Sequence, residues 1–329
     1  MNVLSTIFIL FLACNTSVGW IIPGAIAVGS LLASFASVPL YCLRYECCTK
    51  RWIPLNLAGL NSDLGSKVFG QHLAREVAFK AIKGHVNNPN PPKALVLSFH
   101  GWTGSGKNHV SRLIADSLYK KGMDSIYTHQ VIATHDFPHN DKVKEYSARL
   151  KKFVTEKVKL CPQALFIFDE VDKVPHGLMD ALKPFLDHYN EIDGVDYRKS
   201  IFIFLSNTGA NKINEEVLDH WRKGKKREDL TIKQMDDVIN KGAFNQEGGL
   251  RHSQLILHNL IDYFIPFLPL ERKHIKQCVM ADLEAKKMPL SEEVANQVVK
   301  ELQYFTEDEK VFSKSGCKKV SSKVDFIVG

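Results

Sequence analysis

A glycine-rich stretch with one lysine contains the residues of this chain best suited to chemistry. An apolar run at residues 94–99 precedes it, and apolar residues recur at helical spacing from 110 to 118. Backbone N–H groups of a glycine turn at a helix N-terminus bind an anion, and a lysine there binds the β/γ-phosphates. The sequence therefore predicts a buried strand, a phosphate loop, a helix and a bound nucleoside triphosphate. The loop is Gly101, Trp102, Thr103, Gly104, Ser105, Gly106, Lys107 and Asn108.

Asn108 departs from the usual loop, in which Ser or Thr follows the lysine and its hydroxyl binds Mg²⁺. An amide oxygen is still a hard, neutral ligand that Mg²⁺ accepts, although its reach and angle differ. We therefore expect nucleotide binding to persist and the metal geometry needed for fast hydrolysis to be altered.

Two carboxylates, Asp169 and Glu170, end a second apolar run at residues 165–168. An acidic residue at this strand end holds Mg²⁺ in phosphate-loop enzymes, so Asp169 is the predicted metal ligand. Glu170 can polarise a water for attack on the γ-phosphate. A kinase has no need of this second carboxylate, because its nucleophile is a substrate hydroxyl. The pair therefore favours ATP hydrolysis.

A third apolar run, residues 200–205, ends in Ser206 and Asn207. Ligands of open α/β sheets gather at the carboxyl ends of strands. If this strand lies between the other two, Asn207 faces the γ-phosphate and can orient the attacking water. An asparagine at a strand end is otherwise an ordinary turn residue.

The first 43 residues are strongly apolar. Residues 1–19 have the length and the small terminal residues of a signal peptide, but no early Lys or Arg. Residues 20–43 carry no charge before Arg44 and are long enough to cross a membrane. Prolines and glycines interrupt them, so a bent hairpin in one leaflet is an equal alternative, and a buried core helix is a third. A signal peptide and a membrane anchor predict that the rest lies in the secretory lumen.

Composition limits the remaining functions. About 280 residues follow the hydrophobic segment, enough for one large and one small domain. The net charge of +7 is dispersed, and basic clusters such as residues 223–227 are followed by acids. We therefore predict no nucleic-acid binding. The seven cysteines have no zinc spacing, and the lumen permits disulfides whose pairing sequence alone does not give.

Several motifs together resemble the torsins, AAA+ ATPases of the endoplasmic reticulum and nuclear envelope lumen. Asn after the loop lysine and Gly-Cys-Lys near the end are unusual among AAA+ proteins, and the apolar segment is similar to that of membrane-associated torsins. The motifs span residues 69–318: Phe69-Gly-Gln-His-Leu73, Gly101 to Asn108, Ile167-Phe-Asp-Glu-Val-Asp-Lys173, Phe204-Leu-Ser-Asn207, Asn259-Leu-Ile-Asp-Tyr-Phe264, Pro266-Phe-Leu-Pro-Leu270 and Gly316-Cys-Lys318.

The resemblance implies a large AAA+ domain at residues 55–269, with a five-stranded parallel sheet between helices, and a small helical domain at 270–329. It implies that Lys107 binds phosphate, Asp169 binds Mg²⁺, Glu170 is the catalytic base and Asn207 the first sensor. Lys318 would be the second sensor, and Phe69 and Gly70 would border the adenine. A rival role is a nucleotide-gated binding module with negligible hydrolysis; a lumenal small-molecule kinase is a weaker one.

Torsins also lack an arginine finger, and membrane-anchored activators donate one from their lumenal domains. The resemblance therefore implies an activator-dependent ATPase with a chaperone-like remodelling role at the endoplasmic reticulum and nuclear envelope membrane, and possible homo-oligomers. Three arginines leave room for an internal finger: Arg198, Arg222 and Arg227.

Cys317 adjoins the proposed sensor Lys318, and Cys278 lies in the same predicted helical domain. A disulfide between them would hold the Gly316-Cys-Lys318 turn against the preceding helix and make nucleotide preference sensitive to redox state. Two buried, inert thiols are the alternative.

Overall fold

The computed structural model describes residues 41–245, 250, 253–305 and 309–329, and the chain divides after Cys47 into two units. The predicted signal peptide and residues 20–40 lie outside the described residues. Within the described part, no helix has both the length and the apolar character needed to cross a membrane. The first unit is described from Tyr41, whose ring stacks on Tyr45, and a disulfide joins Cys42 to Cys47.

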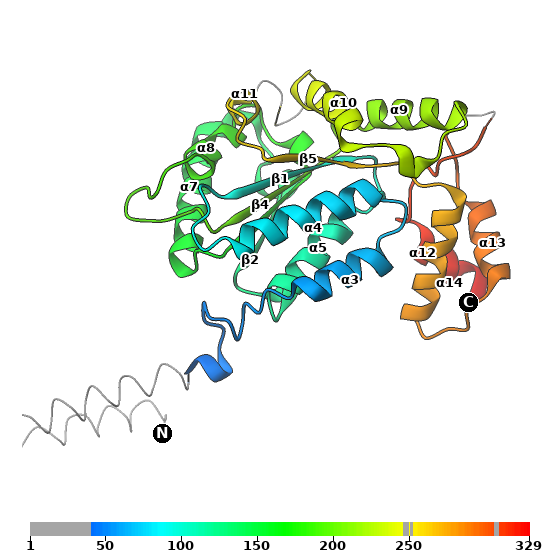
Figure 1. Ribbon diagram of the computed structural model, residues 1–329, viewed down its shortest axis with the longest axis horizontal. Coiled ribbons are helices and arrows are strands. Elements are labelled where there is room, and N and C mark those ends of the chain that lie inside the picture. Colours follow the sequence, from blue (N-terminus) through cyan, green and yellow to red (C-terminus); the bar gives the residue numbers. More distant parts are fainter. Residues whose placement is uncertain (1–40, 246–249, 251–252, 306–308) are drawn as a thin grey trace, which may run out of the picture. The chain divides into compact units, whose positions relative to one another are not determined.

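A five-stranded parallel sheet forms the centre of the second unit (Figure 1). Its order is β2-β3-β4-β1-β5, so β4 lies between β3 and β1. The predicted α/β fold with a parallel sheet is confirmed. The strands are β1 (Leu95–Gly101), β2 (Thr128–Ile132), β3 (Leu165–Asp169), β4 (Ile201–Ser206) and β5 (Tyr263–Phe267).

The first strand ends two positions beyond the apolar run at residues 94–99, because Gly101 still pairs with Phe267 of β5. A methyl group at Gly101 would overlap the Phe267 carbonyl oxygen, so only glycine permits this close pairing of strands.

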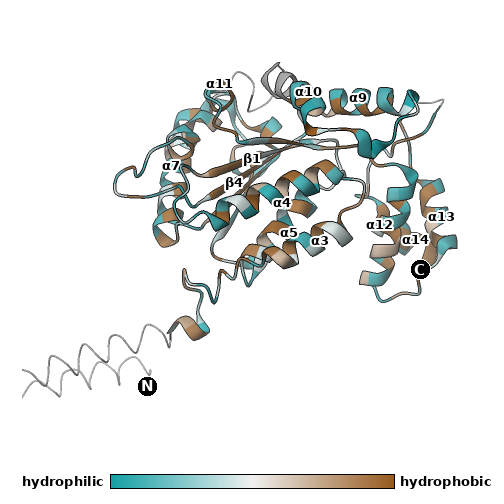
Figure 2. Cartoon of the chain, viewed as in Figure 1, coloured by the Kyte–Doolittle hydropathy of each residue, from teal (hydrophilic) through white to brown (hydrophobic). Residues whose placement is uncertain are grey.

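Helices cover both faces of the sheet, because strand side chains alternate between the faces. Leu97 and Phe99 pack on one face with α3 (Leu57–Lys67), α4 (His72–Asn87) and α5 (Lys107–Leu118). Phe166 and Phe204 pack on the other face. Figure 2 shows the apolar strands between these helices. The second face is covered by α6 (Ala133–Asp136), α7 (Val143–Leu160), α8 (Lys183–Leu186) and α11 (Gln254–Leu257).

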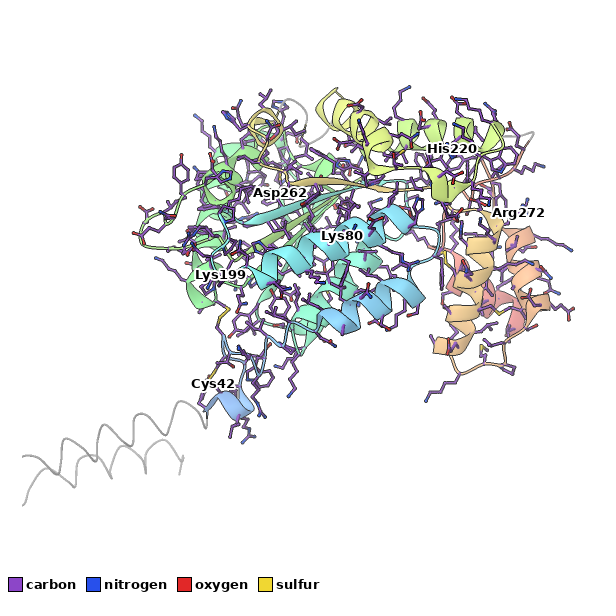
Figure 3. All side chains as sticks on the ribbon, viewed as in Figure 1. Cys42, Lys80, Lys199, His220, Asp262 and Arg272 are labelled. Carbon is purple, nitrogen blue, oxygen red and sulfur yellow. A yellow bond between two sulfur atoms is a disulfide. The ribbon has the colours of Figure 1, made fainter. Side chains whose placement is uncertain are left out.

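Two smaller cores complete this unit. One joins α9 (Ala210–Arg222) and α10 (Ile232–Asn245) to the chain after β5. The other begins at Leu270 and contains α12 (Arg272–Ala285), α13 (Glu292–Glu301) and α14 (Val320–Val328). Arg272, the first residue of α12 and labelled in Figure 3, has its guanidinium carbon 4.0 Å from the centre of the Tyr304 ring.

Two disulfides lie in this unit. Cys48 pairs with Cys161 at the end of α7, and Cys278 of α12 pairs with Cys317. The Cys278 and Cys317 Cα atoms are 6.1 Å apart, within the range that a disulfide spans. The second bridge ties the turn before α14 to α12.

Candidate nucleotide-binding site

The predicted phosphate loop runs from the end of β1 into α5, with two glycines in backbone conformations that other residues rarely adopt. Gly104 has φ +73° and Gly106, the N-cap of α5, has φ +108°. Left-handed geometry turns successive N–H groups toward one side, which makes an anion-binding concavity. The loop therefore has the local shape that the sequence predicted.

Lys107 is the first residue of α5 and is buried. Its Nζ donates to the carbonyl oxygens of Gly101 at 2.6 Å and Trp102 at 3.0 Å, and to Asn207 Oδ1 at 3.0 Å. Burial lowers the pKa of Lys107 to about 8, and the nearby carboxylates of Asp172 and Asp169 oppose that change. Most of the amine is therefore still charged at pH 7, with three neutral acceptors that a phosphate can replace.

Asn108 and Asp169 meet beside this lysine. The Asn108 amide Nδ2 donates to Asp169 Oδ2 at 2.5 Å, and the Glu170 backbone N–H donates to Asp169 Oδ1 at 2.9 Å. The structure thus brings both predicted metal ligands together. It turns the NH₂ group of Asn108, rather than the expected oxygen, toward Asp169.

Glu170 adopts a left-handed backbone with φ +57°, uncommon for a residue with a Cβ and a form of strain often found at functional sites. Its Oε2 accepts a hydrogen bond from Thr134 Oγ1 at 2.7 Å. Thr134 follows the neighbouring strand β2, and sequence reasoning missed it because a single threonine carries no spacing signal.

Asn207 follows β4, and the condition on strand order is met because β4 lies between β3 and β1. Its amide oxygen faces Lys107, and its backbone N–H donates to Asp172 Oδ1 at 3.0 Å. Asp172 lies in the short 3-10 helix at Val171–Lys173 and was not singled out from the sequence. The structure therefore gathers Lys107, Asn108, Asp169 and Asn207 at one edge of the sheet.

The tip of the loop contacts the turn before α14. The Cys317 N–H donates to the Gly104 carbonyl at 3.1 Å, and the Trp102 indole donates to the Lys314 carbonyl at 2.7 Å. A methyl group at Gly104 would overlap the Ser315 carbonyl and lie 3.2 Å from the Lys318 Cβ. The structure therefore brings the root of the Lys318 side chain to the loop.

Phe69 and Gly70 line a cavity of about 1410 Å³ between the end of α3, the start of α4 and α12. Gly70 has φ +67°, and a methyl group there would meet the ring of His274 at 2.8 Å. His274 accepts the Glu271 N–H at Nδ1, and burial lowers its pKa to about 3, so the ring is neutral. The cavity is therefore large enough for a nucleoside and is bordered by both residues predicted to contact the base.

Gln71 and Arg227 hold this side of the site, a role that the sequence did not predict for either residue. The Gln71 amide donates to the carbonyls of Ser105 and Leu268. Arg227 donates to the Gly70 carbonyl at 2.8 Å and to the Pro269 carbonyl at 2.7 Å, with its side chain only 4% exposed. Both polar side chains join segments far apart in the sequence, so no local pattern reveals them.

The three arginines considered as internal fingers all have partners within the chain. Arg198 pairs with Asp196 at 2.8 Å, and Arg222 pairs with Glu309 at 2.8 Å. Arg227 is buried against Gly70, as described above. Each is therefore committed to a structural contact in this conformation.

The donor set at the strand ends fits Mg²⁺, which prefers carboxylate and amide oxygens beside phosphate. Within the described residues, no three His, Cys, Asp or Glu side chains gather into a metal-binding cluster. An ion here would therefore depend on Asp169, on the Asn108 amide and on phosphate oxygens.

Solved structures define the class of this protein. The chain is similar to the S. cerevisiae Hsp104-ADP complex, with a TM-score of 0.58 and 19% identity over 90% of this chain and 49% of that one. It is also similar to Hsp104 with ATPγS and FITC casein in a closed state, with a TM-score of 0.56 and 20% identity over 83% and 46% of the two chains. The chain spans about half the length of these Hsp104 chains. It has the AAA+ fold.

The family follows from sequence comparison. The sequence model of the Torsin family matches residues 42–168, and that of the C-terminal domain of Torsin-1A matches residues 270–327. A torsin-like protein of Caenorhabditis elegans is 43% identical over 289 residues, which are 87% of this chain and 81% of that protein. The chain belongs to the torsin family of AAA+ ATPases, and family membership implies nucleotide binding.

Proposed function

We propose that this protein binds ATP with Mg²⁺ and hydrolyses it at the carboxyl ends of β1, β3 and β4. The observation that carries this proposal is the position of Lys107, which contacts both the phosphate loop and Asn207, with Asp169 on the adjacent strand. Charge on the γ-phosphate would be stabilised where a buried cation and loop N–H groups converge. The loop glycines let the backbone approach the phosphates closely.

Each carboxylate has a separate role. Asp169 holds Mg²⁺, which neutralises charge on the phosphate oxygens. Glu170 accepts a proton from the attacking water, whose oxygen bonds to the γ-phosphorus as the bond to ADP breaks. Thr134 donates a hydrogen bond to Glu170 at 2.7 Å, which holds the carboxylate of the base in place. Lys318 reaches the γ-phosphate from the helical region.

Hydrolysis depends on a membrane-anchored activator whose lumenal domain supplies an arginine. The arginines at 198, 222 and 227 are held internally, which supports a finger from another chain. Such an arginine increases the rate of hydrolysis about 10³–10⁵-fold in related enzymes. The protein then acts in the lumen of the endoplasmic reticulum and nuclear envelope, anchored by residues 20–43, and remodels proteins or membranes, alone or as a homo-oligomer.

A nucleotide-gated binding module is the second candidate. It is favoured by the bond between Asn108 and Asp169, which occupies one predicted metal ligand with the NH₂ group of the other. In that case ATP sets the angle of the helical region and is seldom hydrolysed. A kinase is the weaker reading, because Glu170 is proposed as the base for an attacking water, whereas the nucleophile of a kinase is a substrate hydroxyl.

Glu170→Gln separates these functions. The purified protein and this variant are given radiolabelled ATP, with and without the lumenal domain of a candidate activator, and bound and released nucleotides are measured. We expect equal ATP binding and loss of phosphate release in the variant. Glu191→Gln, the same change in an exposed loop, is the matched control. Equal turnover by Glu170→Gln and wild type contradicts the assigned base, and ATP binding without turnover under any condition favours the binding module.

A further inference from the structure

Asp172 directs both oxygens of its carboxylate at Asn207. Oδ1 accepts the Asn207 backbone N–H at 3.0 Å, and Oδ2 faces the amide Nδ2 at 3.5 Å. The Asp172 side chain is only 10% exposed. Its Oδ2 also lies 3.8 Å from the Nζ of Lys173. A largely buried carboxylate therefore contacts both the backbone and the side chain of the predicted sensor.

The chemistry of this contact fixes one orientation of the Asn207 amide. An ionised carboxylate only accepts hydrogen bonds, so it requires the NH₂ end of the amide. The oxygen end then faces Lys107 Nζ, an obligatory donor, at 3.0 Å. Turning the amide over would place oxygen against carboxylate and NH₂ against ammonium, so both contacts would become repulsive.

A second contact holds the same turn at the next residue, Thr208. His100, fully buried in β1, contacts the Thr208 carbonyl through Nδ1 at 3.0 Å and Ser98 Oγ through Nε2 at 2.7 Å. Burial lowers the pKa of His100 to about 4, so the ring is neutral, donating at Nδ1 and accepting at Nε2. The Asn207 N–H and the Thr208 carbonyl are thus both hydrogen-bonded. The remaining freedom of Asn207 is the rotation of its side-chain amide, which Asp172 restricts.

We propose that Asp172 is a positioning residue that holds the Asn207 amide oxygen toward Lys107, so that the three residues form one relay reading the terminal phosphate. The inference rests on the proposed ATP site. Asp172 does not touch the nucleotide. It acts through Asn207, which aligns the ammonium of Lys107 with the β/γ-phosphates.

Asp172→Asn tests the relay with almost no change in shape. The variant side chain is neutral and can donate as well as accept, so the charge that requires the NH₂ end of Asn207 is gone. Of the two contacts that orient the amide, only the one to Lys107 is kept unchanged. We expect ATP affinity to fall about tenfold, the scale of one charge-assisted hydrogen bond, and ADP affinity to fall less. Calorimetry with ATP and with ADP on the full chain measures the ratio of the two affinities. Asp196→Asn, another aspartate bonded to a backbone N–H, is the matched control.

A double mutant separates the relay from the direct charge of Asp172 on Lys107. In an Asn207→Ala background, Asp172→Asn should change the ATP/ADP ratio less than about twofold, because the route through the amide is gone. Melting temperatures of all variants show whether structure is retained. If Asp172→Asn does not fold, Asp172→Ser, which keeps one acceptor, replaces it in both backgrounds.

The possible outcomes are distinct. An unchanged ratio of ATP to ADP affinity in Asp172→Asn overturns the relay. The relay is also overturned if Asp172→Asn lowers that ratio as much in the Asn207→Ala background as in wild type. Wild-type protein that binds neither nucleotide contradicts the proposed function itself, whereas wild type that prefers ATP alongside an unaffected Asp172 variant removes only this inference.

Discussion

The inner end of the phosphate loop, at Lys107 and Asn108, contacts the ends of β3 and β4, whereas its tip, at Trp102 and Gly104, contacts the turn before α14. Side chains that carry charge or amides make the inner contacts. Backbone groups make most of the contacts at the tip, and glycine at 104 and 316 allows them.

The difference separates two tasks. The inner end presents a cation, carboxylates and an amide on a rigid sheet, which suits binding and cleavage of a phosphate. The tip contacts the turn that contains Lys318, and the disulfide at Cys317 connects that turn to α12. Chemistry thus belongs to one end and coupling to the other, and the following predictions test that division.

The largest expected effect comes from removing disulfides. Replacing both cysteines of the Cys278–Cys317 or the Cys48–Cys161 bridge by serine should lower the free energy of unfolding by about 4–5 kcal/mol in the chain-entropy view. Only the first pair holds the tip of the loop, so only its loss should also change the ATP/ADP affinity ratio. Urea unfolding and calorimetry measure the two effects. Equal nucleotide preference in both variants would mean that the Cys278–Cys317 bridge has only a structural role. Free thiols at both positions in the wild-type protein would show that the bridge does not form.

Gly316→Ala should be the next most damaging change. Gly316 has φ +51°, and a methyl group there would overlap the Gly104 carbonyl oxygen. We expect a loss of about 3 kcal/mol in unfolding free energy, of which the left-handed backbone accounts for about 1–2 kcal/mol, together with weaker ATP binding. Gly224→Ala is the control, because φ is +68° and the space around it is open. Equal losses in the two variants would mean that the contact between turn and loop is unimportant.

Acid should weaken the sheet that carries the inner end. Burial lowers the pKa of His100 and of His129 to about 4, below their unfolded value near 6.5. The unfolded chain therefore binds more protons below pH 6.5, and stability present above that pH is lost as pH falls toward 4. For each histidine, the free energy of unfolding should fall by about 2 kcal/mol between neutral pH and pH 5.

His129→Phe isolates one of these contributions. His129 packs on Phe153 and Phe166, and its Nε2 is buried without a hydrogen bond from the described residues. The variant should be more stable at pH 7.5 and lose about 2 kcal/mol less than wild type between pH 7.5 and 5 in urea unfolding. An unchanged pH dependence would contradict the neutral, buried state assigned to His129.

Trp102→Phe should have the smallest effect. It removes the indole hydrogen bond to Lys314 but keeps an aromatic ring against Phe305, whose centre lies 5.2 Å away. We expect a loss of about 1 kcal/mol in stability and a small change in the ATP/ADP ratio. Trp221→Phe, at a 44% exposed position of α9, is the control. A loss as large as that of Gly316→Ala would show that the side chain, and not the backbone, joins the tip to the turn.

Local patterns indicated which strand ends meet at the inner end, and at the tip they indicated the Cys278–Cys317 disulfide but not the contact between turn and loop. Apolar runs followed by polar residues located Lys107, Asp169 and Asn207, since parallel strands place their carboxyl ends at one edge. Asp172 and Thr134 orient those residues through single hydrogen bonds that leave no spacing signal.

Contacts between distant segments were also beyond local patterns. The Gly104–Gly316 contact joins segments more than 200 positions apart, and sequence provides no register for it. The pairings of Cys42 with Cys47 and of Cys48 with Cys161 were likewise not predicted, because adjacent cysteines permit several connectivities. The roles assigned to the site residues stay predictions, for Lys107, Asn108 and Asp169 as much as for Glu170, Asn207 and Lys318.

The most direct test of the ATP site is nucleotide binding by wild type and Lys107→Met, measured by calorimetry on the full chain with ATP and Mg²⁺. Methionine keeps the length of the buried stem and removes the charge. We expect one saturable ATP per wild-type chain and no detectable binding by the variant, and the melting temperature of each protein checks that the fold is retained. Equal ATP affinity in the two proteins would contradict the assignment of this loop as the nucleotide site.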